Sequence, residues 1–183
     1  MSRNPKDEVG VMFRQGHSGT ISRHIEGVVD GRKFRMFNFM FTVGSGKYQR
    51  VYPYTVFAFK FNGSFPHIYL NNRHNSYSIN TGERIPIHSD FDKKFVLSAQ
   101  RKYETEALEI FTPDVFAKVL DSGFSYDVEL VKQEIIIFID GVTNNFEKLE
   151  KEFNMAIALE DLLGEKLDRF KFEKIGDMSY DLR

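Results

Sequence analysis

The chain contains no cysteine, and this absence excludes disulfides, thiolate zinc sites, iron–sulfur ligation and any cysteine nucleophile. It also has no tryptophan and only 5 prolines, although 19 Phe and 8 Tyr make it rich in other aromatic residues. No apolar run approaches the roughly 18–20 residues of a membrane span, and no signal-peptide pattern opens the sequence. A net charge of −1 disfavours a wholly basic nucleic-acid binder and a disordered polyelectrolyte.

The length of 183 residues is typical of one domain. A globule of this size buries roughly 70% of its unfolded surface, so it needs neither disulfides nor a structural metal to fold. No linker rich in Pro, Ser or Gly divides the chain. We therefore expect a flexible N-terminus over residues 1–12, a single α+β domain over 13–172 and a C-terminal tail over 173–183.

The near-zero net charge hides two halves of opposite sign. Residues 1–102 carry 16 basic and 7 acidic groups, a net charge of +9, whereas residues 103–183 carry 9 and 19, a net charge of −10. One interpretation is a basic face that meets phosphate or anionic lipid. The other is that the two halves pack together and partly neutralise each other.

Most of the apolar pattern alternates with the period of a β-strand. Ile21–Val29 and Lys33–Val43 flank Asp30-Gly31, a strong two-residue hairpin signal, and Val51–Phe61 follows as the next strand. Two sets of phenylalanines alternate on these strands, and we expect them to share one buried face of an antiparallel sheet: Phe37, Phe39 and Phe41, then Phe57, Phe59 and Phe61.

Further strands and two helices complete the predicted fold. The remaining strands are expected at Pro66–Leu70, Lys94–Ala99, Phe124–Val131 and Glu134–Asp140. Asp127 and Glu129 alternate on one of them, as residues of a solvated face do. Thr112-Pro113-Asp114 predicts a short helix over Pro113–Asp121, and the spacing of Asn144 and Glu147 predicts the start of a longer amphipathic helix with apolar residues up to Phe170.

The predicted fold class is thus α+β. It consists of a twisted antiparallel β-sheet, which can curl into a half-barrel, with one short internal helix and a C-terminal amphipathic helix packed on it.

One local cluster has residue types that bind metals. His88, Asp90 and Asp92 alternate, so an extended segment would direct all three toward one side, with His67 or His74 as a further ligand. Such a site would suit a metal-dependent hydrolase. The same pattern is also typical of a solvated loop, which we favour. Because no motif for nucleophilic catalysis is present, we assign no catalytic residue and no cofactor.

The basic residues of the first strands are candidates for binding an anion. They are Arg32, Lys33, Arg35, Lys47 and Arg50. Tyrosines alternate with cations after Lys47, as in proteins that bind single-stranded nucleic acid, but the ribonucleoprotein strand motif is absent. We therefore rank an anionic membrane surface above nucleic acid as the partner of these residues.

The run from Phe13 to Phe59 resembles the start of a bacterial domain family of unknown function, whose members often lie beside predicted transmembrane helices. The matching elements are Phe13, Gly16, the Gly27–Arg32 segment, Phe37–Phe41 and Tyr52–Val56; Phe91–Asp121 is similar to the family's second block and Glu134–Gly141 to its last apolar strand. The resemblance implies no catalytic residues. Because this sequence has no membrane helix, attachment to a membrane would require a partner or a peripheral contact.

Together these patterns predict a non-enzymatic binding or accessory module, a protein-interaction domain with a protein partner. The alternatives are a peripheral binder of anionic lipid or nucleic acid and a metal-dependent hydrolase. The expected location is the cytoplasm, with a peripheral position at a membrane in the lipid-binding case.

Overall fold

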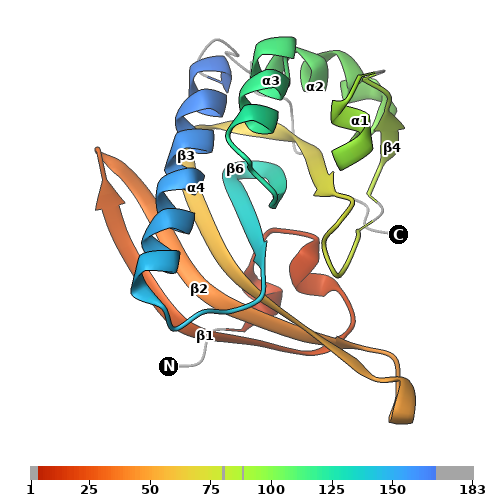
Figure 1. Cartoon of the computed structure of the whole chain (residues 1–183), viewed down its shortest axis with the longest axis vertical. Coiled ribbons are helices and arrows are strands. Elements are labelled where there is room, and N and C mark those ends of the chain that lie inside the picture. The colour runs from red at the N-terminus through yellow and green to blue at the C-terminus, as the bar shows by residue number, and fades with distance from the viewer. Residues whose placement is uncertain (1–3, 80, 88, 168–183) are drawn as a thin grey trace.

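The sheet is organised around the long strand β3 (Figure 1). The computed structural model describes residues 4–79, 81–87 and 89–167. Within those residues six strands form one sheet: β1 (His17–Val29), β2 (Arg32–Val43), β3 (Arg50–Asn72), β4 (Glu83–Ile85), β5 (Phe95–Ala99) and β6 (Asp127–Asp140). All pairs of strands are antiparallel, and β2 and β5 pair with successive halves of β3, while β6 pairs with both halves. Because a strand has two edges, β2 and β5 lie on one edge of β3 and β6 on the other.

Helices cover one face of this sheet, which confirms the predicted α+β class. They are α1 (Phe91–Lys94), α2 (Glu104–Ile110), α3 (Pro113–Asp121) and α4 (Phe146–Leu167). Ile110, Val115 and Leu163 of these helices share a buried core with Phe57 and Ile137 of the sheet. Within the described residues, no helix has both the length and the apolar composition needed to cross a membrane.

The opposite face of the sheet has a second core, covered by the N-terminal segment. Two 3-10 turns, Pro5–Asp7 and Met12–Arg14, lie in this segment, and Met12 and Phe13 are buried against Phe39 and Phe138. Residues 4–12 are thus packed where we expected a flexible N-terminus, because their apolar side chains complete this core. The predicted C-terminal tail, 173–183, and Phe170 lie outside the described residues.

The two sets of phenylalanines line opposite faces of the sheet, so the prediction that they share one face is wrong. Phe37 pairs with Val56, and Phe57 pairs with Met36. Residues directly opposite each other in an antiparallel pair point to the same face. Phe37, Phe39 and Phe41 therefore belong to the core under the N-terminal segment, whereas Phe57 and Phe59 belong to the core under the helices.

Two pairs of predicted strands are continuous in the structure. Val51–Phe61 and Pro66–Leu70 are parts of β3. The predicted strands Phe124–Val131 and Glu134–Asp140 are joined in β6, which begins at Asp127. Shifts in the pairing of β3 with β6 occur between Lys60 and Ile68, and Lys132 has a φ of 55°. These irregularities interrupt the alternation of apolar residues without ending the strands.

The predicted helices are confirmed, with one change at a terminus. The helix over Pro113–Asp121 has the expected bounds. The long helix begins at Phe146, and its first turn is capped by Asn145, whose Oδ1 accepts a hydrogen bond from Lys148 N at 3.0 Å. The side chain of Phe146 is 87% exposed, so it is not part of the apolar face that packs on the sheet.

The β1–β2 turn gives a first testable prediction. Asp30 and Gly31 have φ values of 49° and 79°, and a Cβ on Gly31 would meet no atom within 4 Å. Gly31→Ala therefore costs only the strain of a left-handed backbone, about 1 kcal/mol of unfolding free energy measured by urea denaturation. Gly63→Ala is the matched control, because Gly63 has no positive φ and is expected to change stability by less than about 0.5 kcal/mol.

Candidate functional site

Two of the five basic candidates are held in ion pairs. Arg32 contacts Glu160 and Asp161 of α4. Arg35 lies on the opposite face, 2.6 Å from Glu8 and 2.6 Å from Glu134. The contacts with Glu134, Glu160 and Asp161 join the basic first 102 residues to the acidic remainder, so the two halves do partly neutralise each other.

Of the other three candidates, Lys33 lines one hollow together with Arg35, whereas Lys47 and Arg50 lie apart from both arginines. Lys33 lies near the β1–β2 turn, whereas Lys47 and Arg50 lie at the other end of β2, next to the β2–β3 turn. All five were expected on one basic face, but the register of β2 distributes them over two ends and both faces of the sheet. Anion binding by the five as a group stays a prediction.

The metal candidates do not lie on an extended segment where they are described. Asp90 has helical φ and ψ and pairs with Lys93 at 2.6 Å, and Asp92 is in α1. Asp92 Oδ2 accepts a hydrogen bond from Ile87 N at 3.0 Å. The prediction of an extended segment is therefore wrong for these two residues, and His88 lies outside the described residues. Among the residues that the structure describes, no group of three or more His, Asp or Glu side chains could hold a metal ion.

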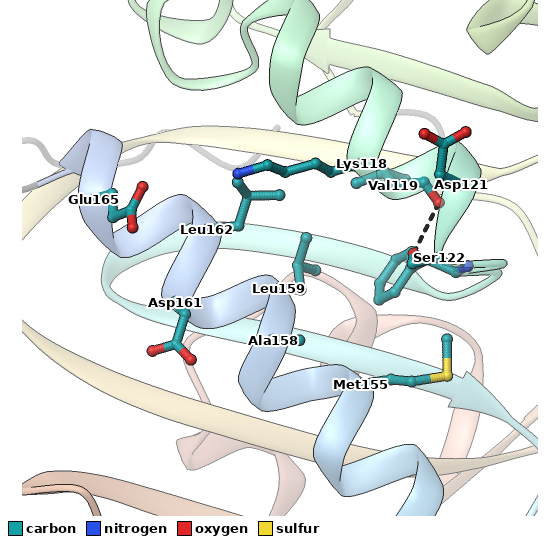
Figure 2. Close-up of a pocket in the computed structure, with 11 residues that line it drawn as sticks. Lys118, Val119, Asp121, Ser122, Met155, Ala158, Leu159, Asp161, Leu162 and Glu165 are labelled. Atoms are coloured by element: carbon teal, nitrogen blue, oxygen red, sulfur yellow. Dashed lines mark hydrogen bonds between the residues drawn. The ribbon is translucent and has the colours of Figure 1, made fainter.

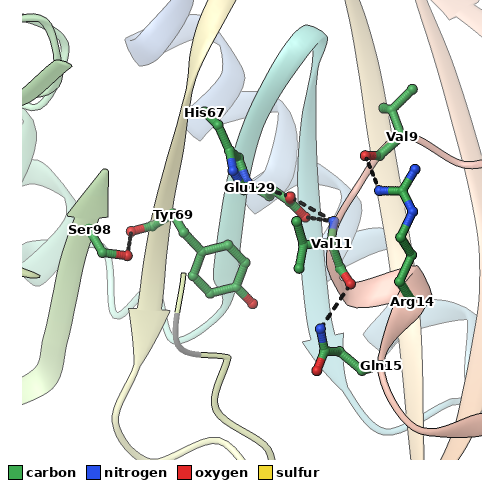
Figure 3. Close-up of polar contacts among 8 residues, drawn as sticks. All are labelled: Val9, Val11, Arg14, Gln15, His67, Tyr69, Ser98 and Glu129. Carbon is green, nitrogen blue, oxygen red and sulfur yellow. Dashed lines mark hydrogen bonds and ion pairs between the residues drawn. The ribbon is translucent and has the colours of Figure 1, made fainter. Parts of the chain in front are cut away.

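Glu129 of β6 holds the N-terminal segment against the sheet through hydrogen bonds (Figure 3). Its two carboxylate oxygens accept hydrogen bonds from Val11 N at 2.8 and 3.1 Å, and His67 Nε2 lies 2.7 Å from Oε1. Gln15 Nε2 donates to Val11 O at 3.2 Å and strengthens the same turn. Glu129 is fully buried, so the prediction that it belongs to a solvated face is wrong. The N-terminal segment covers Glu129, which the sequence pattern assigned to solvent.

Asp127 is the second acid on this strand, and it is also fully buried. Its Oδ1 accepts a hydrogen bond from Asn72 N at 2.6 Å, while Oδ2 has no partner of normal geometry in the described part of the chain. Burial raises the pKa of Asp127 to about 7, and the charge of Asp140 acts in the same direction. A carboxyl group with this pKa could transfer protons, but a side chain without solvent exposure offers no substrate a route to it. We therefore regard Asp127 as a structural residue.

Tyr54 and Tyr69 lie near Asp127, and their hydroxyl groups also have no hydrogen-bond partner of normal geometry among the described residues. Burial raises the pKa of Tyr69 well above its ordinary value, and Asp127 and Glu129 add to the effect. These phenols stay neutral over the physiological range. The buried polar groups on this face of the sheet therefore have a structural role, and none of them is accessible to a ligand.

A groove lies between α3 and α4 on the helical side of the sheet (Figure 2). Its volume is about 540 Å³, within the usual range for ligand sites of roughly 300–1,000 Å³. The floor is apolar and consists of Val119, Phe124, Leu159 and Leu162, with the half-buried Met155 and the exposed Ala158 at the α4 side. The Tyr126 hydroxyl contacts Met155 Sδ at 3.7 Å and fixes that side chain.

Charged residues form the rim of this groove, and most of them are acidic. Lys118 extends from α3 toward α4, and the other charged lining residues are Asp121, Asp161 and Glu165. The surrounding helices have the same sign, since α2, α3 and α4 contain eleven acidic and four basic residues, a net charge of −7. The groove is therefore an apolar surface in an acidic setting.

An ion pair links the two helices beyond the groove. Lys166 Nζ of α4 lies 2.9 Å from Asp114 Oδ2 of α3. A hydrogen bond from the Thr112 hydroxyl, with the further one from Lys166, lowers the pKa of Asp114 to about 2. The start of α3 thus stays next to the end of α4, with the groove between the end of α3 and the middle of α4.

Comparison with known proteins supports the fold and assigns no family. No family model matches the chain, and no curated protein matches it. A solved structure, that of the mycobacterial trehalose monomycolate transport factor A (TtfA), has a similar fold with a TM-score of 0.58. It is 12% identical in sequence, and the match covers 89% of this chain and 86% of that chain. At this identity the likeness shows the α+β fold alone; the resemblance to a bacterial domain family and the cytoplasmic location stay predictions.

Proposed function

We propose that this protein is a non-enzymatic binding module that holds a basic amphipathic helix of a partner protein in the groove between α3 and α4. The observation that carries the proposal is the combination of an apolar floor with an acidic rim. A helix with apolar residues on one face can lie in such a groove, as in other helix-in-groove complexes. Lysines or arginines beside its apolar face would meet Asp121 and Glu165.

The arrangement of the groove supports a protein partner. Leu159 and Leu162 lie three residues apart on α4 and project toward α3, so their side chains form one ridge against which another helix can pack. The structure with a similar fold belongs to a protein named as a transport factor, which is in keeping with an accessory role.

Peptide binding tests this proposal. A fluorescein-labelled amphipathic helix with leucines on one face and lysines on the other is expected to bind the wild-type protein in an anisotropy titration. The same peptide with glutamates in place of lysines is expected to bind at least tenfold more weakly, because it places like charges at the rim.

Variants locate the binding site. Ala158→Arg places a long cation in the groove and is expected to weaken binding at least tenfold. Asn154→Arg is the matched control, since Asn154 is exposed on the same helix and does not line the groove. Asp121→Asn with Glu165→Gln is expected to weaken binding roughly three- to tenfold, because two attractive charges are lost from the rim. Equal binding of the two peptides, or equal effects of the two arginine variants, would contradict the proposal.

A further inference from the structure

The turn between β2 and β3 lies beside the start of β1 and projects from one end of the sheet (Figure 1). His17 is paired with Thr42 at the start of β1, and its Nε2 lies 2.9 Å from Gly44 O in the turn. We use the name hairpin end for the surface formed by residues 14–19 and 43–51.

The hairpin end is basic, and the segments that build it have no acidic residue. Residues 9–25 and 31–82 contain no Asp or Glu. Lys47 and Arg50 are exposed in and next to the turn. On the side of the sheet that the N-terminal segment covers, a hollow of about 500 Å³ has Lys6 and Arg14 as its charged lining residues, together with His17, and none of its lining residues is acidic.

Exposed apolar side chains accompany these cations. Tyr48, at the turn, is 76% exposed, and Val51 is 59% exposed. Val51 is paired with Thr42, and Pro53 is paired with Met40, so Val51 and the 37% exposed Met40 point to the same face of the hairpin. Lys47 Nζ lies 5.2 Å from the centre of the Tyr48 ring, which brings a cation and an amphipathic aromatic group together at the tip.

We propose that the hairpin end binds the surface of an anionic phospholipid bilayer. The cations attract the negatively charged headgroup layer. Tyrosine favours the boundary between water and lipid, and the aliphatic side chains of Val51 and Met40 can enter the boundary between headgroups and acyl chains.

The same observations favour a bilayer over single-stranded nucleic acid. Binders of single strands stack successive bases on several aromatic rings. Among the described residues of the hairpin end, Tyr48 is the single aromatic ring with high exposure, and its exposed apolar neighbour Val51 cannot stack on a base. The charge on this end also differs from the acidic groove between α3 and α4, so lipid binding here does not depend on the proposed helix binding.

Vesicle sedimentation tests the proposal. The full chain is expected to bind phosphatidylcholine vesicles that contain phosphatidylglycerol, and to bind pure phosphatidylcholine vesicles much more weakly. Lys47→Gln with Arg50→Gln is expected to lower the partition coefficient roughly thirtyfold, at about fivefold for each cation. Tyr48→Ser with Val51→Ser is expected to lower it at least fivefold, because less apolar surface leaves water.

Matched controls remove the same groups from other surfaces. Lys102→Gln with Lys151→Gln removes two exposed lysines from the helical side, and Val28→Ser with Leu108→Ser removes two exposed apolar side chains. Both pairs are expected to change the partition coefficient less than twofold. All altered side chains are exposed, and circular dichroism is expected to show the wild-type spectrum for every variant.

Three results would overturn the proposal. One is equal binding to neutral and anionic vesicles, and another is an equal loss in the hairpin-end variants and their controls. The third is an absence of vesicle binding together with binding of a single-stranded oligonucleotide that Lys47→Gln and Arg50→Gln weaken. Helix binding in the α3–α4 groove is measured with a different ligand, so failure of one proposal is distinguishable from failure of the other.

Discussion

Replacement of Arg35 by methionine is expected to lower the free energy of unfolding by about 3–5 kcal/mol. The guanidinium lies between the carboxylates of Glu8 and Glu134, at 2.6 Å from each. The Glu8 side chain is only 1% exposed, and that of Glu134 is 17% exposed. Without Arg35, both carboxylates stay in a poorly solvated place with no cation between them. This cost is large because a buried charge that loses its partner cannot regain its hydration.

Urea denaturation, followed by circular dichroism, measures this loss. Glu8→Gln in the Arg35→Met background removes the charge of Glu8 and is expected to restore at least half of the lost stability. Arg50→Met is the matched control, because Arg50 is exposed on the neighbouring strand and is expected to change stability by less than about 0.5 kcal/mol. A loss below about 1 kcal/mol for Arg35→Met would contradict the ion-pair account.

The unfolding free energy of the wild-type protein is expected to fall as the pH rises, because Asp127 must ionise in a buried place. Asp127→Asn is expected to abolish this fall. The ordinary pKa of this carboxyl is 3.8, and burial raises it to about 7 in the folded state. Below about pH 4 the group is protonated in both states and imposes no cost. As the pH rises toward 7 the unfolded chain ionises while the folded protein retains the proton, so stability falls by about 1.4 kcal/mol for each pH unit. Above pH 7 the loss is constant, at up to about 4 kcal/mol.

The change in unfolding free energy between two pH values, compared between wild type and variant, isolates the effect of Asp127. Between about pH 5 and pH 8, the wild-type unfolding free energy is expected to fall by about 2–3 kcal/mol more than that of Asp127→Asn. The carboxyl carbon of Asp127 is expected to titrate near pH 7 in a carbon-13 NMR experiment. A midpoint near pH 4, or the same pH dependence in both proteins, would contradict the account.

Local signals in the sequence predicted the elements whose formation depends on neighbouring residues. Asp30-Gly31 predicted the β1–β2 turn because few other residue pairs adopt two positive φ angles. Thr112-Pro113-Asp114 predicted the start of α3, since a fixed proline φ and a first-turn acid favour a helix N-terminus. These signals required no knowledge of distant contacts.

The remaining features depend on contacts between distant residues. The register between β2 and β3 decides that Phe37 and Phe57 face opposite cores, and no local pattern encodes that register. Asp127 and Glu129 have the alternation of a solvated face, but the loop after β3 and the N-terminal segment cover them. The sequence alone gave no sign of these long-range hydrogen bonds.

The groove was also missed, although a signal for it exists. The apolar residues of the long helix were expected to form a single face packed on the sheet. Met155, Leu159 and Leu162 widen that face toward α3, and the additional apolar residues indicate a second contact surface on α4. Their position beside α3 becomes apparent only when the two helices are placed on the sheet.

The central claim is that the groove between α3 and α4 binds a basic amphipathic helix, and methyl NMR tests it most directly. With methyl-labelled protein and the leucine–lysine peptide, we expect the largest shift changes at Met155, Leu159 and Leu162, with little change at Leu97, a buried core residue of β5. The Ala158→Arg variant is expected to lose these changes. Shift changes centred away from the groove, or none at saturating peptide, would contradict the account.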